Sequence, residues 1–132
     1  SSSIFGLSQP RISQKVSSGM PEMFYTTEAL CADKNLVSST AIITDGRFSG
    51  ASKGPCIGHI SPEAAEGGNI GLIQDGDLIR IDIANRTIDA VGVDFDERRK
   101  NAPPHTFRKA GGILGVYQTL AVSAMEGGYM NV

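Results

Sequence analysis

The nine residues Thr44–Ser52 (TDGRFSGAS) hold the densest set of side chains that could do chemistry. Asp45 and Arg47 place opposite charges on a tight turn, and Gly46 and Gly50 allow a ligand close to the backbone. Ser49 stands between a bulky residue and a glycine, where its hydroxyl can be held in one direction. The stretch is neither a G-x-S-x-G elbow, because Arg47 stands two residues before Ser49, nor a phosphate-binding P-loop. The residues alone leave three alternatives: an anion-binding loop, a nucleophile loop, or a structural turn.

The chain also has two cysteines and two histidines, whose side chains can bind metals or transfer protons. Cys31 and Cys56 have neither CxxC spacing nor a nearby histidine, so we expect two free thiols in a reducing compartment and no metal or cluster site made by this chain alone. His59, between Gly58 and Ile60, is expected to be a hydrogen-bonded structural histidine. His105 follows two prolines and is expected in a surface loop.

Strand and helix signals surround the loop. The run 40–44 predicts a strand that leads into the loop, and residues 55–60 return to apolar character. Pro21 opens a predicted helix that continues to about Cys31. Ser61 and Pro62 predict the start of a short helix over 63–66, with Ser61 as its cap. Residues 1–18 are rich in serine and are expected to be a tail, a linker or an expression remnant, with the domain proper at 19–132.

The second half of the chain alternates in the way that predicts hairpins with one solvated face. Strands are predicted over 70–73, 78–83 and 87–93, a charged helix over 94–101, and a last helix over 113–125. The fold class is therefore mixed α/β, with a β-rich middle and helices at both ends.

Composition excludes two classes of function. The net charge of −2 does not attract nucleic acid, and the only basic cluster, Arg98–Lys100, follows three acidic residues as on a solvated helix face. The longest apolar stretch, 113–124, is too short and too polar to cross a bilayer, and no signal peptide opens the chain. We expect a cytoplasmic protein that binds neither nucleic acid nor membrane.

Several motifs in order resemble the dihydroxy-acid and phosphogluconate dehydratases. The resemblance covers residues 19 to 127, and its motifs are Gly19–Met23 (GMPEM), Thr44–Ser52, Gly58–Ala64, Glu66–Gly68, Asp75–Asp77 and Asn85–Arg86. The chain departs from the family at residues 14–18, which lack its glycine- and proline-rich stretch, and at Ala51, where many members carry threonine or glycine.

This resemblance implies the C-terminal domain of a hydro-lyase: a swivelling β/α domain with a β-barrel-like sheet flanked by helices. Family members dehydrate 2,3-dihydroxy acids, as in branched-chain amino-acid biosynthesis, or sugar acids to 2-oxo acids. An iron–sulfur cluster acts on the departing C3 hydroxyl, and Mg²⁺ holds the carboxylate and the C2 hydroxyl. Ser49 matches the base that removes the C2 proton, and Glu22 matches a magnesium ligand. The remaining loop residues Asp45, Gly46, Arg47 and Gly50 match the site around that serine.

The resemblance also implies what the chain lacks. The cluster ligands are cysteines of the family's N-terminal domain, so we expect this chain alone to fold without binding iron and without turnover. Its expected partners are its own N-terminal domain, a hydroxy-acid substrate, and further copies in a homodimer or homotetramer. Two alternatives stay open: a phosphogluconate dehydratase, disfavoured by one residue too few between Ser49 and His59, and a non-catalytic interaction module that kept the fold.

Overall fold

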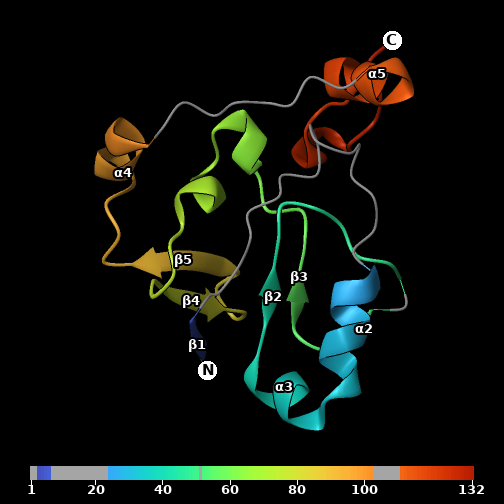
Figure 1. The fold of residues 1–132 in the computed structure, drawn as a ribbon. Helices are drawn as coiled ribbons and strands as arrows, with labels where there is room; N and C mark the ends of the chain where they lie inside the picture. The colour runs from blue at the N-terminus through green and yellow to red at the C-terminus, as the bar shows by residue number, and fades with distance from the viewer. Residues whose placement is uncertain (1–2, 7–23, 51, 103–110) are drawn as a thin grey trace. The chain divides into compact units, whose positions relative to one another are not determined.

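The computed structural model describes residues 3–6, 24–50, 52–102 and 111–132 of the chain (Figure 1). It divides into two compact units, and each is described by itself. One unit is built from Ser1–Arg11 and Leu72–Pro103, and the other from Ile12–Gly71 and Pro104–Val132. Helices and strands occur in both, so the predicted mixed α/β class is confirmed.

The first unit contains a three-stranded antiparallel sheet in the order β1 (Ser3–Gly6), β4 (Leu78–Asp82), β5 (Thr87–Val91). On β4, Ile79 and Ile81 are buried, whereas Leu78 and Arg80, which precede them, are exposed. This alternation puts one face of the strand into the core and leaves the other solvated, as the sequence predicts. The hairpin turn is held by Asp82, whose carboxylate accepts bonds from the backbone and side-chain nitrogens of Asn85 at 3.1 and 2.9 Å.

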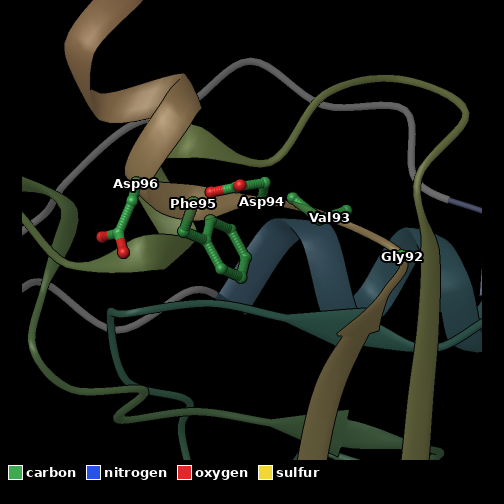
Figure 2. A pocket seen from close by; sticks show the side chains of 5 residues that line it. All are labelled: Gly92, Val93, Asp94, Phe95 and Asp96. Carbon is green, nitrogen blue, oxygen red and sulfur yellow. The ribbon is translucent and has the colours of Figure 1, made fainter.

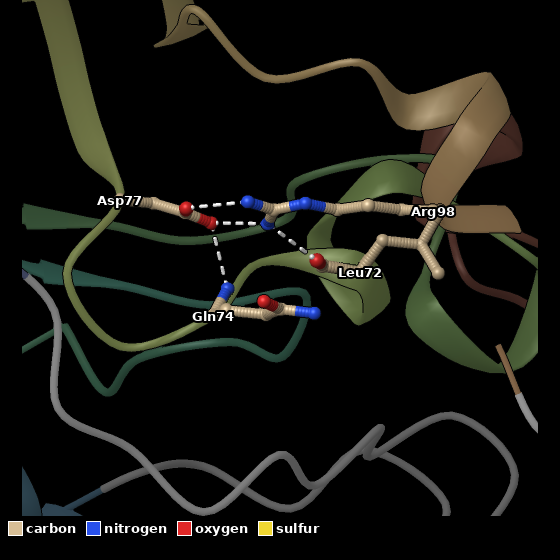
Figure 3. Close-up of polar contacts among 4 residues, drawn as sticks. All are labelled: Leu72, Gln74, Asp77 and Arg98. Atoms are coloured by element: carbon tan, nitrogen blue, oxygen red, sulfur yellow. Dashed lines mark hydrogen bonds and ion pairs between the residues drawn. The ribbon is translucent and has the colours of Figure 1, made fainter. Parts of the chain in front are cut away.

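Helix α4 (Phe95–Asn101) begins where Asp94 accepts a bond from Glu97 N at 2.9 Å. The predicted charged helix is therefore confirmed, but its basic face is not simply solvated. Figure 3 shows Arg98 reaching back to both carboxylate oxygens of Asp77, at 2.5 and 2.7 Å, and to the carbonyl of Leu72 at 3.0 Å. Asp77 also accepts the amide N–H of Gln74 at 2.7 Å. The fork of the guanidinium thus ties α4 to the turn before β4, and it raises the pKa of Arg98 further.

The second unit places a parallel strand pair beside two consecutive helices (Figure 1). Strands β2 (Ile42–Ile43) and β3 (Cys56–Ile57) pair in parallel, and α2 (Phe24–Ala32) is followed by α3 (Lys34–Ser39). Asp33 separates the helices, because its carboxylate caps Asn35 N at 2.8 Å in an extended backbone conformation. The sequence predicts α2 up to about Cys31 but not α3. The predicted first turn of α2, Pro21–Met23, lies outside the described residues.

One predicted element is wrong, and another is only partly confirmed. The apolar run 70–73 predicts a strand, but Asn69–Leu72 forms the 3₁₀ turn η2, in which Gly71 N bonds to Gly68 O at 3.0 Å. The predicted last helix 113–125 is shorter: α5 spans Gly112–Leu120 and a separate 3₁₀ turn, η3, spans Ala124–Glu126. The chain's last residues compete with the helix, since Asn131 N bonds to Leu120 O at 2.8 Å.

The expected barrel-like sheet is a further correction within the described ranges. Their strands form one three-stranded sheet and one two-stranded pair, and these do not close into a barrel. The antiparallel hairpin β4–β5 is predicted by its alternation, whereas the parallel pair β2–β3 is not. Of the expected tail 1–18, residues 3–6 form β1 and pair with β4. Residues 7–18 are not described, so the domain boundary at 19 stays a prediction. None of the described helices is long and apolar enough to cross a bilayer.

Candidate functional site

The loop singled out by the sequence is fixed at its first three residues by the segment that follows β3. Thr44 N donates to Ile57 O at 3.0 Å, and Ile60 N donates to Thr44 O at 3.1 Å. Gly46 O accepts the N–H of His59 at 2.8 Å, while Gly46 N donates to the hydroxyl of Thr44 at 3.0 Å. Residues 44–46 are all buried. The loop therefore starts as a continuation of the strand pair and cannot move independently of it.

Asp45 faces away from solvent. Its side chain is only 4% exposed, and its Oδ2 accepts the N–H of Ala64 at 2.9 Å. Ala64 is the first residue of the 3₁₀ turn η1 (Ala64–Glu66). Asp45 therefore accepts the N–H at the start of that turn, which has no acceptor within the turn itself. The sequence predicts Ser61 as that cap, which is wrong. The predicted site role of Asp45 stays a prediction, but its carboxylate has this structural function.

The second part of the loop is accessible. Arg47 and Gly50 are exposed and Ser49 is half-buried. Ser49 O accepts Ser52 N at 3.0 Å, which closes a turn around Gly50. A side chain at Gly50 would meet no atom within 4 Å, so the packing of the chain does not require glycine there. Ser49 and Arg47 thus lie in the accessible part of a loop whose first three residues are anchored.

Gly58 packs closely against the anchored part of the loop. A Cβ at this position would lie 3.2 Å from Gly46 O and 3.1 Å from Cδ2 of Phe48. The next residue, His59, adopts a left-handed conformation with φ of 56°, and its side chain is exposed. It supports the loop through its backbone N–H. The expected structural role of the His59 side chain stays a prediction, and His105 lies outside the described residues.

Sequence reasoning missed a buried polar cluster next to this loop. Glu63 directly precedes Ala64 and is completely buried. Ser123 Oγ donates to its carboxyl oxygens, at 3.2 and 3.1 Å, and also lies 3.0 Å from Ser61 Oγ. These residues are about sixty positions apart in the chain. Only the Ser-Pro-Glu run in a glycine-rich setting hints at such a cluster, and it names no partner.

A shallow depression lies elsewhere, along Gly92–Asp96 in the first unit (Figure 2). Its carboxylates are those of Asp94 and Asp96. Asp94 already caps α4, and Asp96 lies in the helix's first turn, where acidic residues are stabilised by the helix dipole. None of the residues that line the depression belongs to the loop 44–52, and we assign it no function.

Side chains that could bind a metal ion do not cluster in the described part of the chain. No three histidine, cysteine, aspartate or glutamate side chains there gather in a way that could hold a metal ion. Cys31 and Cys56 are free thiols. Glu22, the magnesium ligand that the resemblance implies, lies outside the described residues, so its role stays a prediction. The described residues do not by themselves form a site for an iron–sulfur cluster or for Mg²⁺.

Comparisons with known proteins agree with the motifs. The family described as dihydroxy-acid/6-phosphogluconate dehydratase C-terminal matches residues 13–128. A dihydroxy-acid dehydratase of Methanothrix thermoacetophila is 48% identical over 115 residues, which is 85% of this chain and 21% of the relative. One of Lachnoclostridium phytofermentans is 47% identical over 116 residues, 86% of this chain and 21% of the relative. One of Methanococcoides burtonii is 48% identical over 110 residues, which is 83% of this chain and 20% of the relative. The chain spans about a fifth of the length of these curated relatives.

Proposed function

Because the chain belongs to the dihydroxy-acid/6-phosphogluconate dehydratase family, as its C-terminal part, we propose that it supplies the proton-abstracting serine of a hydro-lyase. The substrate is a 2,3-dihydroxy acid and the product a 2-oxo acid. The observation that carries this proposal is the division of the loop: residues 44–46 are buried and hydrogen-bonded, whereas Arg47 and Gly50 are exposed and Ser49 is half-buried. A loop that is anchored at one end and accessible at the other holds a catalytic group in a fixed position.

Ser49 acts on the C2 proton of the substrate. Its alkoxide takes that proton and becomes the neutral hydroxyl, while the C3 hydroxyl departs and leaves an enol that tautomerises to the ketone. A serine hydroxyl is a poor base at neutral pH, so this role needs positive charge close to the oxygen. Arg47, two residues earlier in the same loop, is a cation that this part of the chain offers. Its guanidinium is exposed and can approach an anionic substrate as well.

The proposed enzyme needs groups that the described residues do not provide. An iron–sulfur cluster and Mg²⁺ would supply Lewis acidity toward the C3 hydroxyl and would bind the carboxylate. Glu22 is proposed as a magnesium ligand, since a carboxylate is a suitable hard donor. The cluster ligands are expected on an N-terminal domain, which would be the principal partner of this chain, with the swivelling domain delivering Ser49 and Glu22 to the cleft between them.

Two observations favour a dihydroxy acid over 6-phosphogluconate as the substrate. The relatives of about 48% identity are named dihydroxy-acid dehydratases. The spacing of Ser49 and His59 is also one residue shorter than the spacing expected in the phosphogluconate subfamily.

One feature bears on the alternative, an interaction module without catalysis. Helix α5 exposes apolar side chains along much of its length: Ile113 is 67% exposed and Leu114 44%. Exposed apolar side chains in succession are typical of a contact surface. An enzyme whose domains meet in a cleft also needs such a surface, so the feature is compatible with both functions, and only catalysis separates them.

The test is Ser49→Ala in the full-length protein, beside Ser52→Ala as the matched control. Ser52 lies three residues further along the same loop, and its hydroxyl contacts Thr27 Oγ1 at 3.4 Å. We expect Ser49→Ala to lower kcat on 2,3-dihydroxyisovalerate by about 10²–10⁴-fold, with little change in substrate affinity or melting temperature. Ser52→Ala should keep its activity. A destabilised but active Ser49→Ala protein would instead identify Ser49 as a turn residue. Assays with sugar acids and 6-phosphogluconate decide the substrate.

A further inference from the structure

The two cysteines, far apart in the sequence, share one hydrogen-bond acceptor. Cys31 lies near the end of α2 and Cys56 opens β3. The sulfur of Cys31 lies 3.3 Å from the carbonyl oxygen of Lys53, and the sulfur of Cys56 lies 3.5 Å from the same atom. Two thiols that donate to one oxygen are necessarily close neighbours. Neither forms a disulfide in this structure, and both are half-buried.

This proximity is built into the packing of α2. Thr27, Leu30 and Cys31 lie on one face of the helix because they are three and four residues apart. Thr27 and Leu30 are buried, and Thr27 Oγ1 lies 3.4 Å from Ser52 Oγ. A Cβ at Gly54 would lie 3.9 Å from Leu30 Cδ2. The same helix face therefore contacts Ser52, Lys53 and Gly54 in turn, and both sulfurs reach Lys53 O because the segment before β3 lies along α2.

The two thiols differ in reactivity. Burial raises the pKa of the Cys56 thiol, and the neighbouring Cys31 raises it further. Cys56 is therefore protonated at neutral pH and is a slow first nucleophile. We therefore assign the first attack to Cys31 and the resolving step to Cys56.

We propose that Cys31 and Cys56 form a reversible dithiol–disulfide pair, a modification site that links α2 to β3. The oxidant is a small-molecule disulfide such as oxidised glutathione. The Cys31 thiolate attacks one sulfur of the oxidant, forms a mixed disulfide and releases one small thiolate. The Cys56 thiolate then attacks the Cys31 sulfur, forms the internal disulfide and releases the second small thiolate. The two protein thiols are oxidised and the small disulfide is reduced to two thiols.

Formation of the disulfide breaks the bond of each sulfur to Lys53 O, and the exposed Lys53 can bind water instead. The site is independent of the proposed catalysis, because no residue of the pair belongs to the loop 44–50. Its consequence for that loop is indirect: the link fixes the segment that follows Ser52 against α2.

The experiment treats the purified, reduced chain with millimolar oxidised glutathione and identifies the products by intact mass and by peptide mapping. We expect the folded chain to lose both thiols, retain no glutathione, and yield a peptide that joins Cys31 to Cys56. The internal disulfide should exceed mixed disulfides by at least about tenfold. Closure should accelerate by about tenfold per pH unit below the pKa of Cys56.

Controls separate proximity from general thiol reactivity. Cys31→Ser and Cys56→Ser each leave one thiol, and each should end with one bound glutathione. The wild-type chain treated in concentrated urea should accumulate glutathione on both cysteines. If the folded wild-type chain also carried two glutathiones, or formed disulfides only between chains, the proposal would be wrong. Because the products are identified by mass, the result does not depend on dehydratase activity.

Discussion

The hydroxyl of Ser123 is expected to stabilise the unit that carries the candidate site, although it lies far from the site in sequence. A serine hydroxyl has one proton to donate and two lone pairs to accept with. Ser123 uses all three: it donates to the carboxyl of Glu63, lies 3.0 Å from Ser61 Oγ, and is 3.4 Å from the backbone N–H of Met125. Since its only proton goes to Glu63, Ser61 must be the donor in the contact between the two serines.

The magnitude follows from this assignment. Ser123→Ala removes a donor from a carboxyl that is completely buried, where no solvent can replace it. Leaving a buried polar group with fewer partners costs about 1–3 kcal/mol, and we expect about 2 kcal/mol here. Ser61→Ala removes a donor from a half-buried hydroxyl and should cost about 1 kcal/mol. The double variant should cost less than the two single changes together, by about 0.5–1 kcal/mol, because the serine–serine contact is lost only once.

Urea unfolding of the four proteins, followed by far-ultraviolet circular dichroism, measures these free energies of unfolding. The slope with urea should stay unchanged, which shows that the variants alter stability and not the extent of unfolding. Equal losses for Ser61→Ala and Ser123→Ala would refute the assigned direction of the bonds. Strict additivity in the double variant would refute the contact between the serines.

Three further predictions concern glycine, a carboxylate and the metal. Gly68→Ala should prevent normal folding, because the new Cβ would lie 1.7 Å from Pro62 O. Gly50→Ala should leave the melting temperature unchanged, and it should reduce turnover of the full-length enzyme if substrate approaches that turn. Asn85→Ala should raise the pKa of Asp82, because the side-chain and backbone bonds from Asn85 lower that pKa. Carboxyl-carbon NMR measures the pKa of Asp82 in both proteins. The stability that the lowered pKa contributes is present at neutral pH and should disappear as the pH falls through the folded-state pKa. Glu22→Gln in the full-length enzyme should weaken Mg²⁺ binding and depress activity without loss of the cluster absorbance, and unchanged magnesium dependence would contradict it.

The elements predicted correctly from the sequence are those whose signals are local. The alternation of β4 and the turn at Asn85 define the hairpin within fourteen residues, Leu78 to Val91. Asp94 predicts the start of α4, because a short carboxylate side chain reaches the amide three residues later without help from the rest of the chain.

The elements predicted wrongly depend on distant residues. Isoleucine and leucine in 70–73 favour a strand locally, yet Gly71 approaches Ala64 so closely that its Cβ would lie 3.0 Å from Ala64 Cβ, which favours a compact turn. The apolar run after Leu120 favours continued helix, yet Ala121 forms a β-bridge with Met130 and Val122 N bonds to Tyr129 O. A pattern in one segment does not report which other segment will compete for its backbone.

The candidate site shows the same division. Residue types and spacing identify the loop 44–52, but they do not reveal which of its side chains face inward. Asp45 and Arg47 look equivalent in the sequence, as two charges on either side of a glycine. Their environments are decided by residues 57–64, whose amides and carbonyls hold Thr44, Asp45 and Gly46. The contact between buried Glu63 and half-buried Ser123 joins residues sixty positions apart, and no local signal names Ser123 as the partner.

The burial of Asp45 bears directly on how this loop works. A carboxylate that already accepts the N–H of Ala64 and is 4% exposed has its direction fixed by the fold, so its negative charge is not directed at an anionic substrate. Had Asp45 and Arg47 both faced outward, their charges would have largely cancelled where the proposed carboxylate substrate would bind. With Asp45 turned inward, Arg47 is the charged side chain that the accessible part of the loop presents next to Ser49. The structural role of Asp45 and the proposed electrostatic role of Arg47 therefore follow from one arrangement.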